Sequence, residues 1–167
     1  MAYEFYVTIE GTKQGAFKGE SMREAHSAKL AGLTYKHTIQ SPRDAATGRA
    51  SGKRQHGQIT FTKEWGPASP QLMQALCTNE LLPSVLFEFI KTTDDGQEEI
   101  YHTIKLVNAT VAKIDYITGG AGGEGVNTAK HQSGYDTHEL EAVALTYQRI
   151  EMENRTGSTM AEDDWTQ

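Results

Sequence analysis

Alternation of apolar and polar side chains with a period of two runs through most of this chain and limits the folds available to it. In Tyr3–Glu10, the apolar residues Phe5, Val7 and Ile9 take every second position, as expected of a half-buried β-strand. Further strand-like segments are Thr34–Gln40, Ile59–Lys63, Ser84–Lys91, Glu99–Ile117 and Leu140–Met152. Together they predict about six to eight strands, and Glu99–Ile117 is long enough for one bent strand or two.

One short helix and one hairpin turn interrupt this pattern. We expect the helix at about Pro70–Thr78, with Ser69 as its cap and Pro70 in the first position, where a missing N–H costs nothing. The sequence Asp94-Asp95-Gly96 predicts the hairpin turn. The apolar stripe of the helix consists of Leu72, Ala75 and Leu76. A single helix among many strands predicts a mainly β fold, a closed barrel or a sandwich with the helix on one side.

Composition excludes several classes of protein. The length of 167 residues suits one domain covering residues 1–167. The single cysteine, Cys77, excludes an intramolecular disulfide framework, and a buried small side chain is its expected role. No segment approaches the roughly 18 apolar residues of a membrane span, and the first residues lack the features of a secretory signal. The excess of 22 acidic over 16 basic residues argues against general nucleic-acid binding.

No pattern predicts a catalytic, cofactor or metal site. The G-x-G-x-x-G match at Gly120–Gly125 lacks the apolar helix that a dinucleotide site needs, so residues 118–138 are expected to form a Gly-rich flexible loop. The six histidines show no metal-ligand spacing and are expected in solvent. Glu139 and Glu141 share one strand face. An exposed, solvated pair is favoured there, and a hydrolase that uses them as acid and base is a weaker alternative.

A basic arm and an acidic end stand out against the acidic whole. The arm is Ser41–Gln58, too long and polar for a hairpin turn, and loops of this kind are usually functional or disordered. Four basic residues against Asp44 give the arm a formal charge of +3; they are Arg43, Arg49, Lys53 and Arg54. The end, residues 153–167, is expected to be a polar, acidic tail. If one copy's arm meets another copy's acidic end, the charges complement each other, and such a repeated contact builds a ring or a filament.

The sequence motifs resemble those of one protein family, over most of the chain. The arm sequence SPRDAATGRASGKRQH is similar to the long arm of the haemolysin-coregulated protein (Hcp) family, which forms the inner tube of the bacterial type VI secretion system. The other similar segments are Ile9–Gly11, Phe17–Ser21, Phe61–Lys63, Ala68–Leu72, Thr118–Glu124, Glu141–Glu151 and Glu162–Trp165. The segment Val126–His138 looks longer than its counterpart in the family.

The resemblance implies a fold, an assembly and a set of partners. The fold is a tight β-barrel of two packed sheets with a helix against one side. Its subunits form hexameric rings that stack into a tube inside a contractile sheath, and the tube is expelled with its spike, able to carry small effector proteins. The subunit waits in the bacterial cytoplasm and is secreted without a signal peptide. No enzymatic activity, cofactor, nucleic-acid partner or membrane insertion is implied.

The resemblance also places the arm at contacts between subunits or rings. Its residues expected there are Arg43, Asp44, Arg49, Lys53, Arg54 and His56, and their expected acidic counterpart is Asp163, Asp164 and Trp165. A secreted module that binds cargo or effectors as an isolated ring is the alternative function. In that case a pocket or the lumen would matter more than stacking, and a co-purified small protein or metabolite should be lost when Val126–His138 is shortened.

Overall fold

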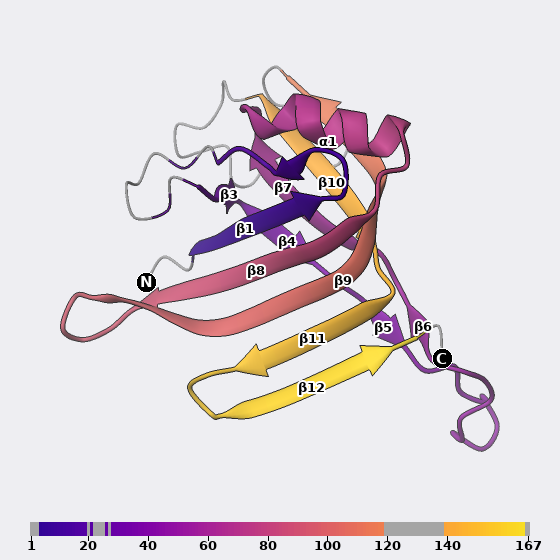
Figure 1. Cartoon of the computed structure of the whole chain (residues 1–167). Coiled ribbons are helices and arrows are strands. Elements are labelled where there is room, and N and C mark those ends of the chain that lie inside the picture. The colour runs from indigo at the N-terminus through magenta and orange to yellow at the C-terminus, as the bar shows by residue number, and fades with distance from the viewer. Residues whose placement is uncertain (1–3, 20, 22–25, 27, 119–138, 166–167) are drawn as a thin grey trace.

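The computed structural model describes residues 4–19, 21, 26, 28–118 and 139–165, and it is mainly β (Figure 1). One helix is present in this described part, α1 (Ala68–Cys77). The strands are β1 (Glu4–Gly11), β2 (Gly15–Ala16), β3 (Leu30–Gly32), β4 (Thr34–Lys36), β5 (Ile39–Gln40), β6 (Gln55–His56), β7 (Ile59–Glu64), β8 (Leu82–Thr92), β9 (Glu98–Ile117), β10 (Leu140–Thr146), β11 (Arg149–Asn154) and β12 (Thr159–Asp164).

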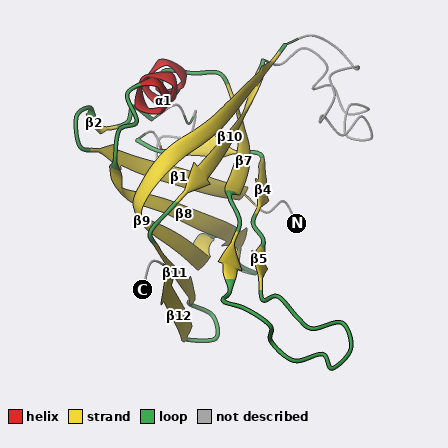
Figure 2. Ribbon diagram, turned by 90° about the vertical axis from the view of Figure 1, so that its right-hand side faces the viewer, coloured by secondary structure: helices red, strands yellow, loops and turns green. Residues whose placement is uncertain are grey.

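The long strand β9 belongs to two sheets and curves from one to the other (Figure 2). Its first part pairs with β8 and β11, and its last part pairs with β10. The change of partner falls beside Asn108, whose φ of 52° is left-handed, a conformation that Asn tolerates better than most residues. One continuous strand therefore carries the chain around the core, which answers whether Glu99–Ile117 forms one strand or two.

The segment Leu30–Lys36 links the two ends of the strand order β1-β8-β9-β10-β7. Its first part, β3, pairs with β1, and its second part, β4, pairs with β7. Because β3 and β4 follow one another and do not pair, the ladders do not form an unbroken ring there. The mainly β fold with two packed sheets agrees with the prediction.

The core lies between the inner faces of the two sheets. It includes the fully buried residues Val7, Leu30, Ile59, Phe61, Val85, Phe87, Leu106, Val143 and Leu145. Helix α1 covers one side of it, as Figure 2 shows. The expected stripe is confirmed, since Leu72 and Ala75 are buried and Leu76 packs against the core. The turn after β8 is also confirmed, with Gly96 at a φ of 77°.

Two details of the helix differ from expectation. The capping position is occupied by Pro67, and Ser69 lies inside the first turn. Its hydroxyl oxygen accepts a bond from the Gly66 N–H at 3.0 Å and its proton goes to Glu141. Cys77 is exposed, so the expected buried role is wrong. It follows Leu76 by one position, and neighbouring helix residues point about 100° apart, which turns it away from the core.

The strand count and the C-terminal end also differ. The described residues form twelve strands, because several two- and three-residue strands are too short for a pattern to register. The expected strand Leu140–Met152 is divided at Tyr147–Gln148 into β10 and β11. The expected polar tail pairs with β11 as β12, residue 164 opposite residue 149. β12 is acidic and pairs only with β11 among the described strands, so it lacks the apolar alternation that marks a half-buried strand.

Candidate assembly surface

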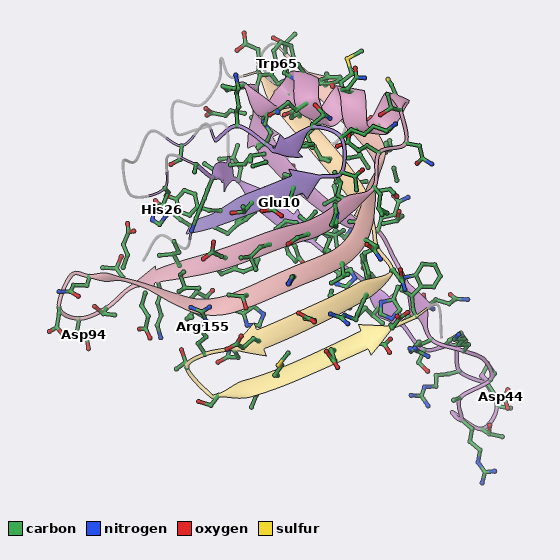
Figure 3. The ribbon with its side chains drawn as sticks, in the orientation of Figure 1. Glu10, His26, Asp44, Trp65, Asp94 and Arg155 are labelled. Carbon is green, nitrogen blue, oxygen red and sulfur yellow. The ribbon has the colours of Figure 1, made fainter. Side chains whose placement is uncertain are left out.

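The arm leaves the sheets after β5 and returns in β6. These two strands pair with each other, Ile39 opposite His56 and Gln40 opposite Gln55, in a small sheet separate from the main one. The arm projects from the rest of the molecule, and Asp44 lies near its tip (Figure 3). The base of the arm, where β5 and β6 pair, is therefore where the arm joins the rest of the protein.

The tip of the arm is folded on itself. The Asp44 carboxylate accepts bonds from the Thr47 hydroxyl at 2.8 Å and the Ala46 N–H at 3.2 Å. The Asp44 carbonyl accepts the Gly48 N–H at 2.8 Å, and the Asp44 N–H donates to the Arg49 carbonyl at 2.8 Å. Gly48 has a φ of 70°, which favours glycine. The pKa of Asp44 is lowered from its ordinary value, and the largest cause is the hydrogen bond from the Thr47 hydroxyl. The backbone and side chain of Asp44 therefore stabilise the turn at the tip.

Two guanidinium-bearing residues flank this turn. Arg43 forms a β-bridge with Ala50, and both Arg43 and Arg49 are exposed. Lys53 is exposed further along the arm. The hydrogen bonds at the tip fix the backbone of Arg43 and Arg49, so both side chains start from defined positions and extend into solvent.

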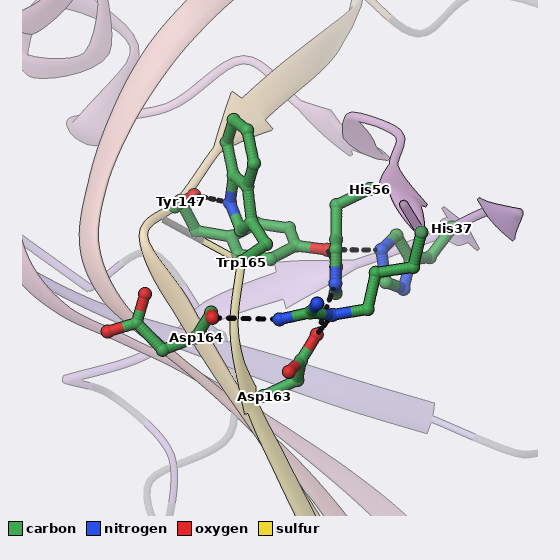
Figure 4. Close-up of polar contacts among 7 residues, drawn as sticks. His37, His56, Tyr147, Asp163, Asp164 and Trp165 are labelled. Atoms are coloured by element: carbon green, nitrogen blue, oxygen red, sulfur yellow. Dashed lines mark hydrogen bonds and ion pairs between the residues drawn. The ribbon is translucent and has the colours of Figure 1, made fainter. Parts of the chain in front are cut away.

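The base of the arm is fixed to β12 by charge-assisted hydrogen bonds (Figure 4). The Arg54 Nε and the Asp163 Oδ2 form an ion pair, and the Arg54 guanidinium also donates to the Asp164 carbonyl at 2.9 Å. His56 Nε2 lies 2.7 Å from the same Asp163 oxygen. The hydrogen bond from Arg54 is the largest cause that lowers the pKa of Asp163, and the bond from His56 is the next. The same bond to Asp163 raises the pKa of Arg54. The arm and the acidic end thus meet within one chain.

A second set of contacts continues inward from His56. Its Nδ1 lies 2.7 Å from the Tyr147 hydroxyl, which is also 2.7 Å from His37 Nε2. Burial, and then the charge of Asp163, raises the pKa of Tyr147. The Trp165 ring stacks on the His56 ring with centroids 6.2 Å apart, and its indole N–H donates to the Tyr147 carbonyl. The side chain of His56 is only 1% exposed, so the expectation of solvent-exposed histidines is wrong for it.

The structure groups the expected site residues into two sets. Arg54, His56, Asp163, Asp164 and Trp165 converge at the base of the arm, while Arg43, Asp44, Arg49 and Lys53 lie out along it. Sequence reasoning missed His37 and Tyr147. Tyr147 occupies an apolar face after Val143 and Leu145, and nothing in that pattern marks its hydroxyl as a partner for two histidines.

The carboxylate pair has a different environment from the expected one. Glu139 is exposed, but Glu141 is fully buried, so the expectation of a solvated pair is wrong. Glu141 lies opposite Lys63 in the β10–β7 ladder, with 2.5 Å between Lys63 Nζ and Glu141 Oε1, and both side chains are 0% exposed. The Ser69 hydroxyl donates to the same oxygen at 2.8 Å.

The described part of the chain offers neither a metal cluster nor a membrane-spanning helix. No group of three or more His, Cys, Asp or Glu side chains there could hold a metal ion. No described helix is long and apolar enough to cross a membrane. The expected Gly-rich loop, apart from Thr118, lies outside the described residues, as do His131 and His138.

The fold is that of a class of β proteins from type VI secretion. The family model described as "Type VI secretion system effector, Hcp" matches residues 6–153. The chain therefore belongs to the Hcp family. It is 32% identical to the "Major exported protein" of Pseudomonas aeruginosa over 175 residues, covering 99% of this chain and 96% of that protein.

Solved structures with the family name share the fold. A structure described as "Crystal structure of Hcp protein" superposes with a TM-score of 0.85 at 28% identity, covering 98% of both chains. The Hcp1 protein from E. coli EAEC 042, in a mutant form, gives a TM-score of 0.81 at 27% identity, covering 98% of this chain and 99% of that one. Hcp3 from Pseudomonas aeruginosa gives a TM-score of 0.76 at 26% identity, over 98% and 99% of the chains.

Proposed function

We propose that this protein is a structural subunit of the type VI secretion inner tube. It assembles into hexameric rings, the rings stack, and the tube is expelled with its spike from inside a contractile sheath, carrying effector proteins. The subunit resides in the bacterial cytoplasm before firing and takes no catalytic part. Membership of the Hcp family and the name of the exported relative support this proposal.

The anchored arm is the observation that carries the proposal. A loop that projects from a compact domain exposes backbone and charge without adding to the core. Because the arm is nevertheless ordered at its tip and fixed at its base, we infer that it binds a partner. Arg43 and Arg49 present positive charge at the tip, and the protein as a whole has a net charge of −6. A second copy therefore offers acidic surface to the arm, and complementary charges set the register of such contacts.

Charge reversal at the tip tests this role. The variant Arg43→Glu/Arg49→Glu is compared with Arg43→Lys/Arg49→Lys, which keeps the charge at the same positions. We measure native mass and negative-stain images at several protein concentrations, and circular dichroism to check the fold. The reversal should abolish stacking of rings and leave the fold intact, while the lysine variant should stack. Equal stacking by both variants would remove the arm tip from the interface.

The same images separate the proposal from the cargo-binding alternative. Annular particles with a sixfold mass that stack as concentration rises agree with a tube subunit. Rings that never stack, and that retain a co-purified protein, favour the isolated-ring module. A strict monomer at all concentrations in low and moderate salt would contradict both.

A further inference from the structure

The base of the arm is a short stem made of residues 37–40 and 54–57. Its strands β5 and β6 share two register pairs, and the Gly57 N–H donates to the Thr38 carbonyl at 2.8 Å. These bonds join the two stem strands to each other, in a sheet separate from the main one. A hairpin of two strands is only marginally stable alone in water, so contacts with the rest of the protein must fix the direction of the arm.

One hydroxyl outside the arm contacts both strands of the stem (Figure 4). The Tyr147 oxygen lies 2.7 Å from His37 Nε2, before the arm, and 2.7 Å from His56 Nδ1, after it. Both imidazole rings also lie edge-on to the Tyr147 ring, with centroids 5.7 and 5.5 Å away. Tyr147 therefore bridges the point where the chain enters the arm and the point where it returns.

The partners of this hydroxyl use both its donor and its acceptor. The Asp163 carboxylate accepts from His56 Nε2, which leaves Nδ1 of a neutral His56 as the acceptor for the Tyr147 proton. The Tyr147 oxygen then accepts the Nε2–H of His37. Burial, and then the charge of Asp163, raises the pKa of Tyr147, so the phenol keeps the proton that it donates. Each stem strand thus has its own hydrogen bond to one oxygen atom.

Tyr147 is a firmer support for the arm than the edge strand is. It is 4% exposed, belongs to the core, and lies between β10 and β11, which both pair with β9. Asp163 lies on β12, which pairs only with β11 among the described strands, and its side chain is 36% exposed. Solvent and salt weaken an ion pair in such a place. The direction of the arm relative to the core therefore depends chiefly on Tyr147.

We propose that Tyr147 is the positioning residue of the arm, whose hydroxyl holds both stem strands and fixes the direction in which the arm leaves the protein. This role acts within one chain, before a second copy binds. Its consequence for assembly rests on the proposed function. An arm that already points in its binding direction loses less conformational freedom when it meets a partner, and such preorganisation strengthens association.

A distance between two spin labels on the whole protein tests this role. One label is attached to Cys77, which is exposed at the end of α1, and the other to Ala46→Cys at the exposed arm tip. Labelled protein is mixed with an excess of unlabelled Cys77→Ser, so that each ring holds at most one labelled subunit. Pulsed electron paramagnetic resonance should then give one narrow distance distribution for the natural arm.

Three variants in this labelled background make the test specific. Tyr147→Phe removes the hydroxyl and keeps the ring, so the distribution should broaden. Tyr35→Phe is the matched control and should stay narrow, because it removes a buried hydroxyl that has no hydrogen-bond partner among the described residues. His37→Leu removes one of the two stem bonds and should also broaden the distribution. The double variant Tyr147→Phe/His37→Leu should be no broader than Tyr147→Phe.

A second pair of labels separates positioning from general loosening of the fold. The distance from Cys77 to Lys105→Cys, exposed in β9, should stay narrow in every variant. A narrow arm distribution in Tyr147→Phe or His37→Leu would overturn the role of the bridging hydroxyl. Equal broadening in Tyr35→Phe, or equal broadening of the Cys77–Lys105 distance, would overturn it as well.

Stacking of rings gives a separate readout. Tyr147→Phe should raise the protein concentration needed for stacking roughly tenfold, the size of one hydrogen bond's contribution, and Tyr35→Phe should leave it unchanged. Stacking at the natural concentration by a Tyr147→Phe protein with a broadened arm would overturn the consequence for assembly. A natural protein that never stacks would contradict the proposed function, while the distance distributions would still decide the role of Tyr147.

Discussion

Two of the ion pairs that connect distant parts of this chain lie in opposite surroundings. Lys63 and Glu141 are fully buried under α1, while Arg54 and Asp163 join the arm to an edge strand with side chains 36% exposed. Solvent and salt screen the second pair and cannot reach the first. The buried pair is therefore a constraint on the core, and the edge pair, with its several converging bonds, serves chiefly to place the arm.

The largest expected effect comes from removing one partner of the buried pair. Glu141→Gln removes the buried carboxylate that Lys63 Nζ contacts, and removing one partner of a buried ion pair costs about 3–5 kcal/mol in similar cases. Urea unfolding followed by circular dichroism measures the loss. Glu139→Gln is the matched control, the same change on an exposed neighbour, and should stay within about 0.5 kcal/mol of the natural protein.

A double variant sharpens this result. Lys63→Met/Glu141→Leu removes both charges and should recover most of the stability lost in Glu141→Gln, because apolar residues of similar volume often replace a buried pair at little cost. An equal loss in the double and single variants would show that packing at this position, and not the broken charge pair, determines the effect.

A smaller effect is expected at Ser69. Ser69→Ala deletes the hydroxyl that donates to Glu141 and accepts from the Gly66 N–H, which should cost about 1–3 kcal/mol. Urea unfolding measures this as well. If Ser69 stabilises the protein through Glu141, the loss caused by Ser69→Ala should be smaller in the Lys63→Met/Glu141→Leu background. An equal loss there would show that Ser69 acts through its bond to Gly66 at the start of the helix.

A still smaller global effect is expected at the edge pair. Asp163→Asn should shift the midpoint of thermal unfolding less than Ser69→Ala does, but should increase hydrogen exchange in the arm. The exchange of the natural arm should rise with salt, and that of Asp163→Asn should rise less. Glu162→Gln, an exposed neighbour on β12, is the control; arm exchange that changes equally in both would contradict the specific anchor.

The smallest expected effect is the acid response of this carboxylate. Because the pKa of Asp163 is lowered in the folded protein, its contribution is complete above its ordinary pKa, about 3.9, and is lost as the pH falls further. The unfolding midpoint below pH 4 should therefore decline more steeply in the natural protein than in Asp163→Asn. Parallel declines would show that Asp163 gains nothing from Arg54 and His56.

The sequence predicted more of the fold than of the candidate site. Alternation in Phe5, Val7 and Ile9, the stripe of α1 and the turn at Gly96 could be predicted because each depends on near neighbours. β12 and the two-residue strands at the base of the arm could not be predicted, because edge and isolated strands do not need alternating apolar side chains. The arm itself was evident from its charge, while its anchor was not.

By itself, the sequence determined the mainly β fold, the charged arm and the membership of a family, because local periodicity and ordered motifs carry that information. Only the tertiary structure decided that Glu141 is buried against Lys63, that Cys77 faces solvent, and that Tyr147 joins His37 to His56. The partners in the buried and bridging contacts are separated by 78, 110 and 91 residues. Such distances along the chain leave no local pattern, so the folding of the sheets around the core sets both the burial and the meeting of these groups.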